Sequence, residues 1–176
     1  MYRTTRRSAC VLSVLIIGLM FSLPASVVAR ATITIVKGHA DLSDGDIGGE
    51  VQPDAAGNLH FHHFSQRGNF SLKSLQGDDI VIDGKQTVVL NGKLDQSFTG
   101  PFAGTYTVST SLEGHDTVLW EGRVHGQVVQ GNFTGRIIAY GSGPFAGMLL
   151  QLDILEDDSN ADTFELIGLI LAPRGQ

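Results

Sequence analysis

Three histidines lie close together in the segment Leu59-His60-Phe61-His62-His63-Phe64, and imidazole is a good metal ligand. On a β-strand, His60 and His62 share one face and lie about 7 Å apart by the rise of the strand. Such a pair could supply two ligands to zinc or copper, with a third from His39, His125 or a carboxylate. The spacing therefore predicts a candidate metal site at His60 and His62.

A second interpretation of the same segment needs no metal. The strand is then half exposed, with a polar face made of histidine and an inward face made of Leu59, Phe61 and His63. Closed ligand sets are usually more visible in a sequence than this one is. The sequence therefore favours the second interpretation and predicts no cofactor, with zinc as the alternative here.

A second candidate set consists of Glu121, Arg123 and His125, which alternate and so share one face of a predicted strand. If that face lines a cavity, it could bind an anionic or polar ligand, with His125 titrating near neutral pH. If it faces water, it is an ordinary solvated face, which is the commoner arrangement. The direction of Trp120 separates the two, because the opposite face carries Val118, Trp120 and Val124.

No complete catalytic motif is present. The chain has no Gly-x-Ser-x-Gly sequence, and its one cysteine, Cys10, lies near the N-terminus. The acidic stretches 41–46 and 156–162 could bind calcium, but neither has Gly at the sixth and Glu at the twelfth position of an EF-hand loop. We expect both stretches to be solvated connections, and we predict no catalytic residue.

Strands must position all of these groups, because apolar and polar residues alternate with period two and helical periodicity is nearly absent. Ten or so short strands at about ten-residue spacing predict an all-β domain. The expected architecture is a single antiparallel β-barrel, with a β-sandwich as the alternative. The expected strands cover residues 33–36, 58–65, 69–75, 80–83, 87–91, 94–99, 105–112, 118–125, 132–140, 148–155 and 164–172.

Glycine marks the expected turns between these strands. Asn-Gly and Asp-Gly between apolar runs are strong hairpin signals. The expected turns are Ala56-Gly57-Asn58, Asp83-Gly84-Lys85, Asn91-Gly92-Lys93 and Glu113-Gly114-His115-Asp116.

The pentapeptide Gly-Pro-Phe-Ala-Gly occurs twice, at residues 100–104 and 143–147. Proline fixes its own φ and lacks an amide proton, and the flanking glycines permit positive φ, so both copies are expected to form a turn or bulge. Phe102 and Phe145 should then close the ends of the core. Other internal matches do not share the same offset, which argues against a tandem duplication.

The segment Gly-Ser-Gly-Pro-Phe-Ala-Gly-Met-Leu-Leu-Gln-Leu-Asp-Ile resembles a glycine-rich turn that recurs in secreted bacterial β-barrel proteins of unassigned function. More distantly, it resembles the Gly-x-Gly-x-Phe segment of dirigent and allene oxide cyclase-like barrels. The resemblance covers about residues 106–155 and implies a small closed antiparallel barrel, of calycin or allene oxide cyclase-like type, with a central cavity. No functional residue of those families can be carried over.

Residues 1–31 are expected to be a signal peptide. Three arginines precede an apolar stretch at 9–23, and small residues offer cleavage after Ala31 or Ala29. The barrel domain would then be 32–176, exported to the periplasm or the cell exterior. Without the four arginines of the leader, its formal charge falls from −6 to −10, which argues against nucleic acid and anionic membranes as partners.

The last expected strand is apolar on both faces, which suggests that a second subunit covers residues Phe164 to Ala172. The expected function is a non-catalytic binding module for a small, partly apolar ligand. One alternative is a cyclase or isomerase that uses the barrel cavity for proton transfer. Another is a structural or interaction protein with a solid core.

Overall fold

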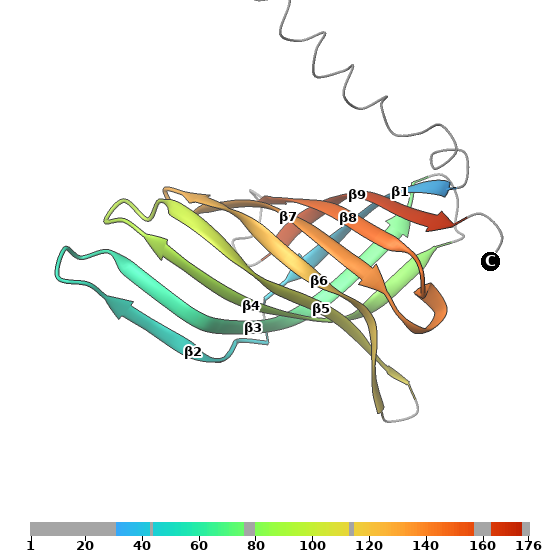
Figure 1. Cartoon of the computed structure of the whole chain (residues 1–176), viewed down its shortest axis with the longest axis horizontal. Coiled ribbons are helices and arrows are strands. Elements are labelled where there is room, and N and C mark those ends of the chain that lie inside the picture. Colours follow the sequence, from blue (N-terminus) through green and yellow to red (C-terminus); the bar gives the residue numbers. More distant parts are fainter. Residues whose placement is uncertain (1–30, 43, 76–79, 113–114, 157–162, 174–176) are drawn as a thin grey trace, which may run out of the picture. The chain divides into compact units, whose positions relative to one another are not determined.

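The computed structural model of this protein describes residues 31–42, 44–75, 80–112, 115–156 and 163–173. Within them lie nine strands and one short 3₁₀ helix (Figure 1). Their bounds are β1 Ala31–Asp41, β2 Asp46–Pro53, β3 Leu59–Ser74, β4 Val81–Leu94, β5 Gly100–Leu112, β6 His115–Val129, β7 Asn132–Gly141, η1 Gly143–Phe145, β8 Leu149–Glu156 and β9 Thr163–Pro173.

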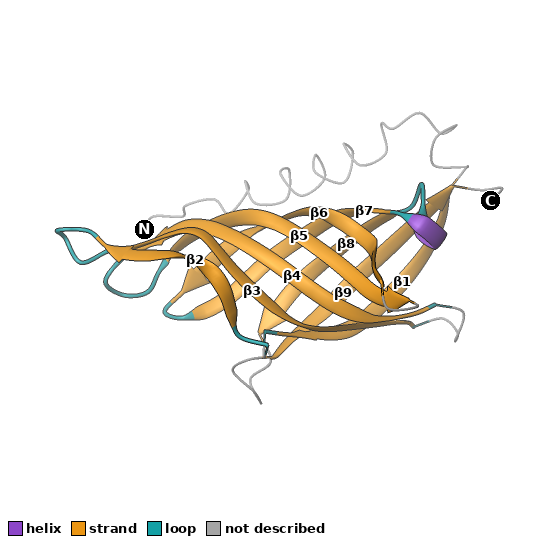
Figure 2. Ribbon diagram, turned by 90° about the horizontal axis from the view of Figure 1, so that it is seen from below, coloured by secondary structure: helices purple, strands orange, loops and turns teal. Residues whose placement is uncertain are grey.

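Eight of these strands close into an antiparallel barrel. The order in the sheet runs from β1 through β9, β8, β7, β6, β5 and β4 to β3, and β1 also pairs with β3. That closing pair runs from Val36 opposite Ser74 to Ala40 opposite Phe70. Figure 2 shows the strands winding around one another to enclose the interior. The barrel prediction is therefore confirmed over the sandwich, since closure leaves a single sheet.

The ninth strand, β2, lies outside the closed ring. It pairs with the first half of β3, from Asp46 opposite Gln66 to Pro53 opposite Leu59. The β1 contact uses the second half of β3, so β1 and β2 follow each other along one edge of that long strand. Sequence reasoning assigned part of this region to a solvated connection and missed β2.

The core forms where alternate residues of the strands point into the barrel. Trp120, Tyr106 and Phe70 are the largest fully buried side chains. Burial of one large apolar side chain contributes about 1.5–3 kcal/mol, and twenty apolar residues share this core within the described part of the chain. Hydrophobic burial inside the barrel is thus the main stabilising contribution.

Two β-bulges change which residues face inward. Val118 pairs with Ser109 and Trp120 with Val108, so Leu119 is an extra residue. Val118 is therefore 40% exposed, and the expectation that it shares a face with Trp120 was wrong. A similar bulge between Phe61 and Phe64 puts His63 at φ 51° on the surface, so its expected inward position was also wrong.

Two of the expected glycine turns are not turns. Asp83-Gly84-Lys85 and Asn91-Gly92-Lys93 lie inside β4, because Gly84 pairs with Phe70 and Gly92 pairs with Phe61. The missing side chain of Gly92 leaves room for the Phe61 ring. The true turn comes later, within the expected strand 94–99, where Asp95 accepts hydrogen bonds from the amides of Ser97 and Thr99. The expected turn at Gly57, with φ 80°, is confirmed.

The two Gly-Pro-Phe-Ala-Gly copies have different structures. Residues 143–147 form η1 and the turn that follows it, as expected. Residues 100–104 begin strand β5, so the expected turn at this copy was wrong. Phe102 is buried and Phe145 is half buried in contact with the core, as expected for both rings. None of the described residues forms a helix long and apolar enough to cross a membrane.

Candidate binding site inside the barrel

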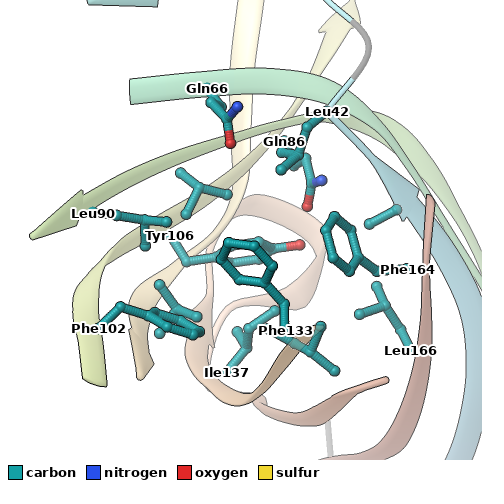
Figure 3. A pocket seen from close by; sticks show the side chains of 14 residues that line it. Leu42, Gln66, Gln86, Leu90, Phe102, Tyr106, Phe133, Ile137, Phe164 and Leu166 are labelled. Atoms are coloured by element: carbon teal, nitrogen blue, oxygen red, sulfur yellow. The ribbon is translucent and has the colours of Figure 1, made fainter. Parts of the chain in front are cut away.

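A small cavity of about 60 Å³ lies inside the barrel, near the end at which β8 finishes and β9 begins. Phe102, Tyr106, Phe133 and Phe164 line it together with aliphatic side chains (Figure 3). Leu42 and Gln66 also line it and are partly exposed, as are Phe133 and Phe164, so the cavity reaches the surface beside these side chains; we call the part beside Leu42 and Gln66 its mouth. The site is therefore an apolar cavity that has an opening toward solvent.

Three phenylalanines on alternate strands form one wall of the cavity. Phe102 of β5 lies 5.8 Å from Phe133 of β7, centroid to centroid, and Phe133 lies 6.1 Å from Phe164 of β9 in an edge-to-face contact. The ring of Phe102 reaches Phe133 across β6 because Gly126 stands where a side chain would block it. Ring contacts of this kind stabilise the fold by about 0.5–1.5 kcal/mol beyond the contribution of burial, and the three rings form one apolar side of the cavity.

Tyr106 supplies the unusual polar group of the cavity. Its side chain is buried, and its hydroxyl has no hydrogen-bond partner within the described part of the chain. The ring meets Phe70 edge to face at 6.3 Å. Burial raises the pKa of the Tyr106 hydroxyl well above its usual value, so the group stays neutral. A buried hydroxyl without a partner costs about 1–3 kcal/mol, and a ligand group in the cavity could remove that cost.

Gln86 is the second buried polar side chain at the site. Its amide nitrogen donates to the main-chain oxygen of Asp41 at 2.7 Å. The Asp41 carboxylate in turn accepts from the amide and the side chain of Asn69, at 2.7 and 2.9 Å. These bonds hold the Gln86 amide in one orientation. In Figure 3 its oxygen and the Tyr106 hydroxyl both point into the cavity.

The other end of the interior is closed by aromatic packing. Trp120 is fully buried and stacks on Phe145 of η1, with ring centroids 5.1 Å apart. Its indole nitrogen is the other buried polar atom without a partner among the described residues. Trp120 does not line the cavity, so its predicted ligand contact is not supported by its position. It acts as a plug.

Glu121, Arg123 and His125 lie on the outer face of β6, and all three are exposed. Because Trp120 points into the barrel, these three residues must point outward, since the alternation predicts that they lie on the opposite face. His125 pairs in register with Arg136, whose guanidinium binds Asp153 at 2.7 Å. The interior-cavity alternative for this set is thus wrong, and ligand binding on the outer face stays a prediction.

His60 and His62 lie side by side, as expected, with stacked rings 6.4 Å apart. His60 Nε2 lies 3.1 Å from a carboxylate oxygen of Asp54. The same carboxylate accepts from the Asn58 side chain at 2.8 Å and from Lys93 at 3.2 Å. His60 therefore belongs to a hydrogen-bond network at the β2–β3 turn, and His62 joins it only through the ring contact.

The Asn58 side chain and then His60 lower the pKa of Asp54 far below its ordinary value. Because the folded state holds this carboxylate ionised, its contribution to stability is present above the ordinary carboxyl pKa. That contribution is lost only as pH falls through the lower folded value. The Asp54 carboxylate therefore stays ionised in the folded state through pH changes near neutrality.

No group of three or more His, Cys, Asp or Glu side chains in the described part of the chain is arranged to hold a metal ion. His39 on β1 and His125 on β6 do not complete the His60–His62 pair. Residues 157–162 of the second acidic stretch lie outside the described residues, so the expected solvated connection and its calcium-binding alternative are both untested there.

Sequence reasoning did not select the residues that line the cavity. Tyr106 and Val108 alternate along β5 and so share one face, and both are buried. A single tyrosine on an apolar inward face was the signal that could have identified it. Nothing in the sequence could pair it with Gln86 and Phe164, because three different strands supply these residues. Comparisons with protein-family models, curated proteins and solved structures find no match to this chain.

Proposed function

We propose that this protein is an exported, non-catalytic binding module for a small, mainly apolar molecule that carries one hydrogen-bonding group. The single observation behind this proposal is the Tyr106 hydroxyl, which has no partner among the described residues, in a cavity whose other lining side chains are apolar except for Gln66 and Gln86. Apolar pockets with a few polar groups are the usual form of small-molecule sites. The ligand would bury its apolar part against Phe133 and Phe164 and bond to Tyr106.

The chemistry of the lining favours binding over an isomerase or cyclase. Proton transfer needs a group with a pKa near the working pH. Among the described lining residues, Tyr106 alone can titrate, and its raised pKa keeps it protonated. A carboxylate or histidine for proton transfer would have to enter with the ligand.

The size of the cavity limits the ligand. Pockets for drug-sized molecules measure about 300–1,000 Å³, well above the 60 Å³ of this cavity. We therefore expect a molecule no larger than one ring, or the narrow end of a longer molecule that extends through the mouth between Leu42 and Gln66. A ring would also require the partly exposed side chains at the mouth to move.

Two small probes of nearly equal size test the proposal. Benzene and phenol differ by one hydroxyl, and NMR titration of the cavity side chains measures the Kd of each. We expect both to bind and Tyr106→Phe to reduce the preference for phenol over benzene about fivefold, the value of one hydrogen bond. Tyr140→Phe is the matched control, since Tyr140 is 68% exposed on the outer surface.

The unliganded Tyr106→Phe protein should be as stable as wild type or more stable by about 1 kcal/mol, because the change removes an unpaired buried hydroxyl. If neither probe shifts the signals of the cavity residues in a saturable way, the binding proposal fails and the solid-core alternative gains support. Equal preference for phenol in the wild type and in Tyr106→Phe would remove the assigned role of the hydroxyl.

A further inference from the structure

Large apolar side chains cover part of the outer surface of the barrel. They project from β7, β8, β9 and β1, which are consecutive in the sheet. We call this surface the apolar wall; it consists of Ile138, Tyr140, Leu149, Ile167, Leu169, Leu171, Ile33 and Ile35. Their neighbours Ile137, Leu150 and Ile170 point inward and are buried, so alternation directs the wall residues outward.

Strand register brings the wall residues side by side. Tyr140 of β7 pairs with Leu149 of β8, which pairs with Leu171 of β9. Side chains opposite each other on adjacent strands are about 5 Å apart. A second row contains Ile138 of β7 and Leu169 of β9, with Gln151 between them. The wall is therefore one continuous patch and not a set of scattered residues.

Paired charges border the wall on one side. Arg136 of β7 binds Asp153 of β8 at 2.7 Å, and Lys37 of β1 forms an ion pair with Glu165 of β9. Each cation has its anion on the neighbouring strand of the same protein. This border therefore has no excess charge that would select a partner of opposite sign.

The rest of the barrel surface differs. On β5 the corresponding outward residues include Thr105, Thr107 and Ser109, and on β4 they include Lys85 and Thr87. Exposed apolar residues also occur elsewhere, such as Val51 on β2, Val81 on β4 and Val118 on β6, but the strand pairing that places apolar side chains directly opposite each other is the one on β7, β8 and β9. A one-sided apolar patch is typical of an interaction surface, whereas scattered exposed apolar residues are not.

The area of the wall matches what a dimer needs. Five of its residues, Ile33, Ile35, Ile138, Tyr140 and Ile167, are 36–68% exposed. At about 200 Å² for a fully exposed side chain, the value for aromatic residues, they present at most about 500 Å² of apolar surface. A standard interface buries about 800 Å² per partner, of which about 65% is apolar in homodimers, so the two areas agree.

We propose that the apolar wall is an interface between two copies of this protein, packed wall to wall about a two-fold axis. In such an isologous interface one patch meets itself, so it needs neither a partner of another shape nor one of opposite charge. A lipid surface fits less well, because the formal charge of −6 opposes anionic membranes. The interior cavity is not involved, so this proposal is independent of the proposed function.

The test compares oligomeric state across matched variants. The full chain is expressed with its own N-terminal segment, purified in the form that the cell releases, and measured by sedimentation and native mass spectrometry at 1–100 µM. We expect a dimer, and we expect Ile138→Glu and Ile167→Glu each to weaken it at least a hundredfold. Val81→Glu is the control, since Val81 is 52% exposed on β4, outside the wall; it should leave the dimer intact.

Three results would overturn the proposal. The first is a wild-type monomer at 100 µM. The second is a dimer that survives both wall substitutions. The third is a monomer that binds phosphatidylcholine vesicles and loses that binding in Ile138→Glu, which would make lipid the occupant of the wall. Circular dichroism confirms the fold of each variant, and Tyr140→Lys replaces either glutamate variant that does not fold.

Discussion

The two copies of Gly-Pro-Phe-Ala-Gly show one sequence in two conformations. Residues 100–104 extend as the start of β5 between β4 and β6, whereas residues 143–147 turn through η1 between β7 and β8. The local sequence is the same, so the neighbouring strands must decide. The first copy pairs with strands on both sides, and the second pairs with none of the strands in the described ranges.

The glycines have different structural roles in the two copies. In the strand copy, a Cβ on Gly104 would collide with the main-chain oxygen of Val89 on β4, so glycine is needed for close approach. In the turn copy, Gly143 has open space around it but adopts φ 56°. Glycine is needed there for its backbone conformation. Identical residues thus meet two separate physical requirements.

The phenylalanines should give the largest difference between the copies. Phe102→Ala should lower the free energy of unfolding by about 3–5 kcal/mol, because its buried ring leaves a void. Phe145→Ala should cost about 1–2 kcal/mol, since that half-buried ring loses mainly its stacking on Trp120. Equilibrium urea unfolding at pH 7 measures both values. Equal losses at the two positions would contradict the assigned difference in burial.

Alanine at the glycines should give a smaller difference. Gly104→Ala should cost about 2–3 kcal/mol, because the new Cβ meets main chain that cannot move without breaking the pairing with β4. Gly143→Ala should cost about 1 kcal/mol from the positive φ alone. The same urea experiment compares them. A larger loss at Gly143 than at Gly104 would reverse the interpretation.

Asparagine should give the smallest effect and the sharpest distinction. Asn tolerates the left-handed conformation better than other residues with a side chain, so Gly143→Asn should cost less than about 0.5 kcal/mol. Gly104→Asn should be at least as harmful as Gly104→Ala, because the obstacle there is space. If asparagine cost less stability than alanine at position 104 but not at position 143, the two roles of glycine would be assigned to the wrong copies. Positive φ would then matter at Gly104, and close approach would matter at Gly143.

The same distinction explains which parts of the fold were predictable. The turn at Gly57 was predicted correctly because its glycine adopts positive φ. The turns at Gly84 and Gly92 were predicted wrongly because both glycines lie inside β4, where they pair with Phe70 and Phe61 of β3. A sequence displays a glycine in both cases. Which aromatic ring lies opposite that glycine depends on the register between two strands, and the sequence of one strand does not specify that register.

The candidate site was less predictable than the fold. Alternation predicted that Trp120 lies opposite Glu121, Arg123 and His125 but not which face points inward, and in the structure both Trp120 and Tyr106 are buried. It did not indicate that the Tyr106 hydroxyl lacks a partner, since that depends on every strand around it. The bulge at Leu119 also moved Val118 to the surface, and one extra residue in a strand leaves no clear mark in a sequence.

By itself, the sequence determined that this protein is an all-β domain with an apolar interior, because period-two alternation reflects the geometry of a single strand. It also determined that Glu121, Arg123 and His125 share the face opposite Trp120. Tertiary structure alone decided that eight strands close into a barrel and that one Gly-Pro-Phe-Ala-Gly copy is extended while the other forms a turn. It also decided that the Tyr106 hydroxyl lies in the cavity without a partner among the described residues. Each of these depends on contacts between strands far apart in the chain, and local residue preferences do not encode such contacts.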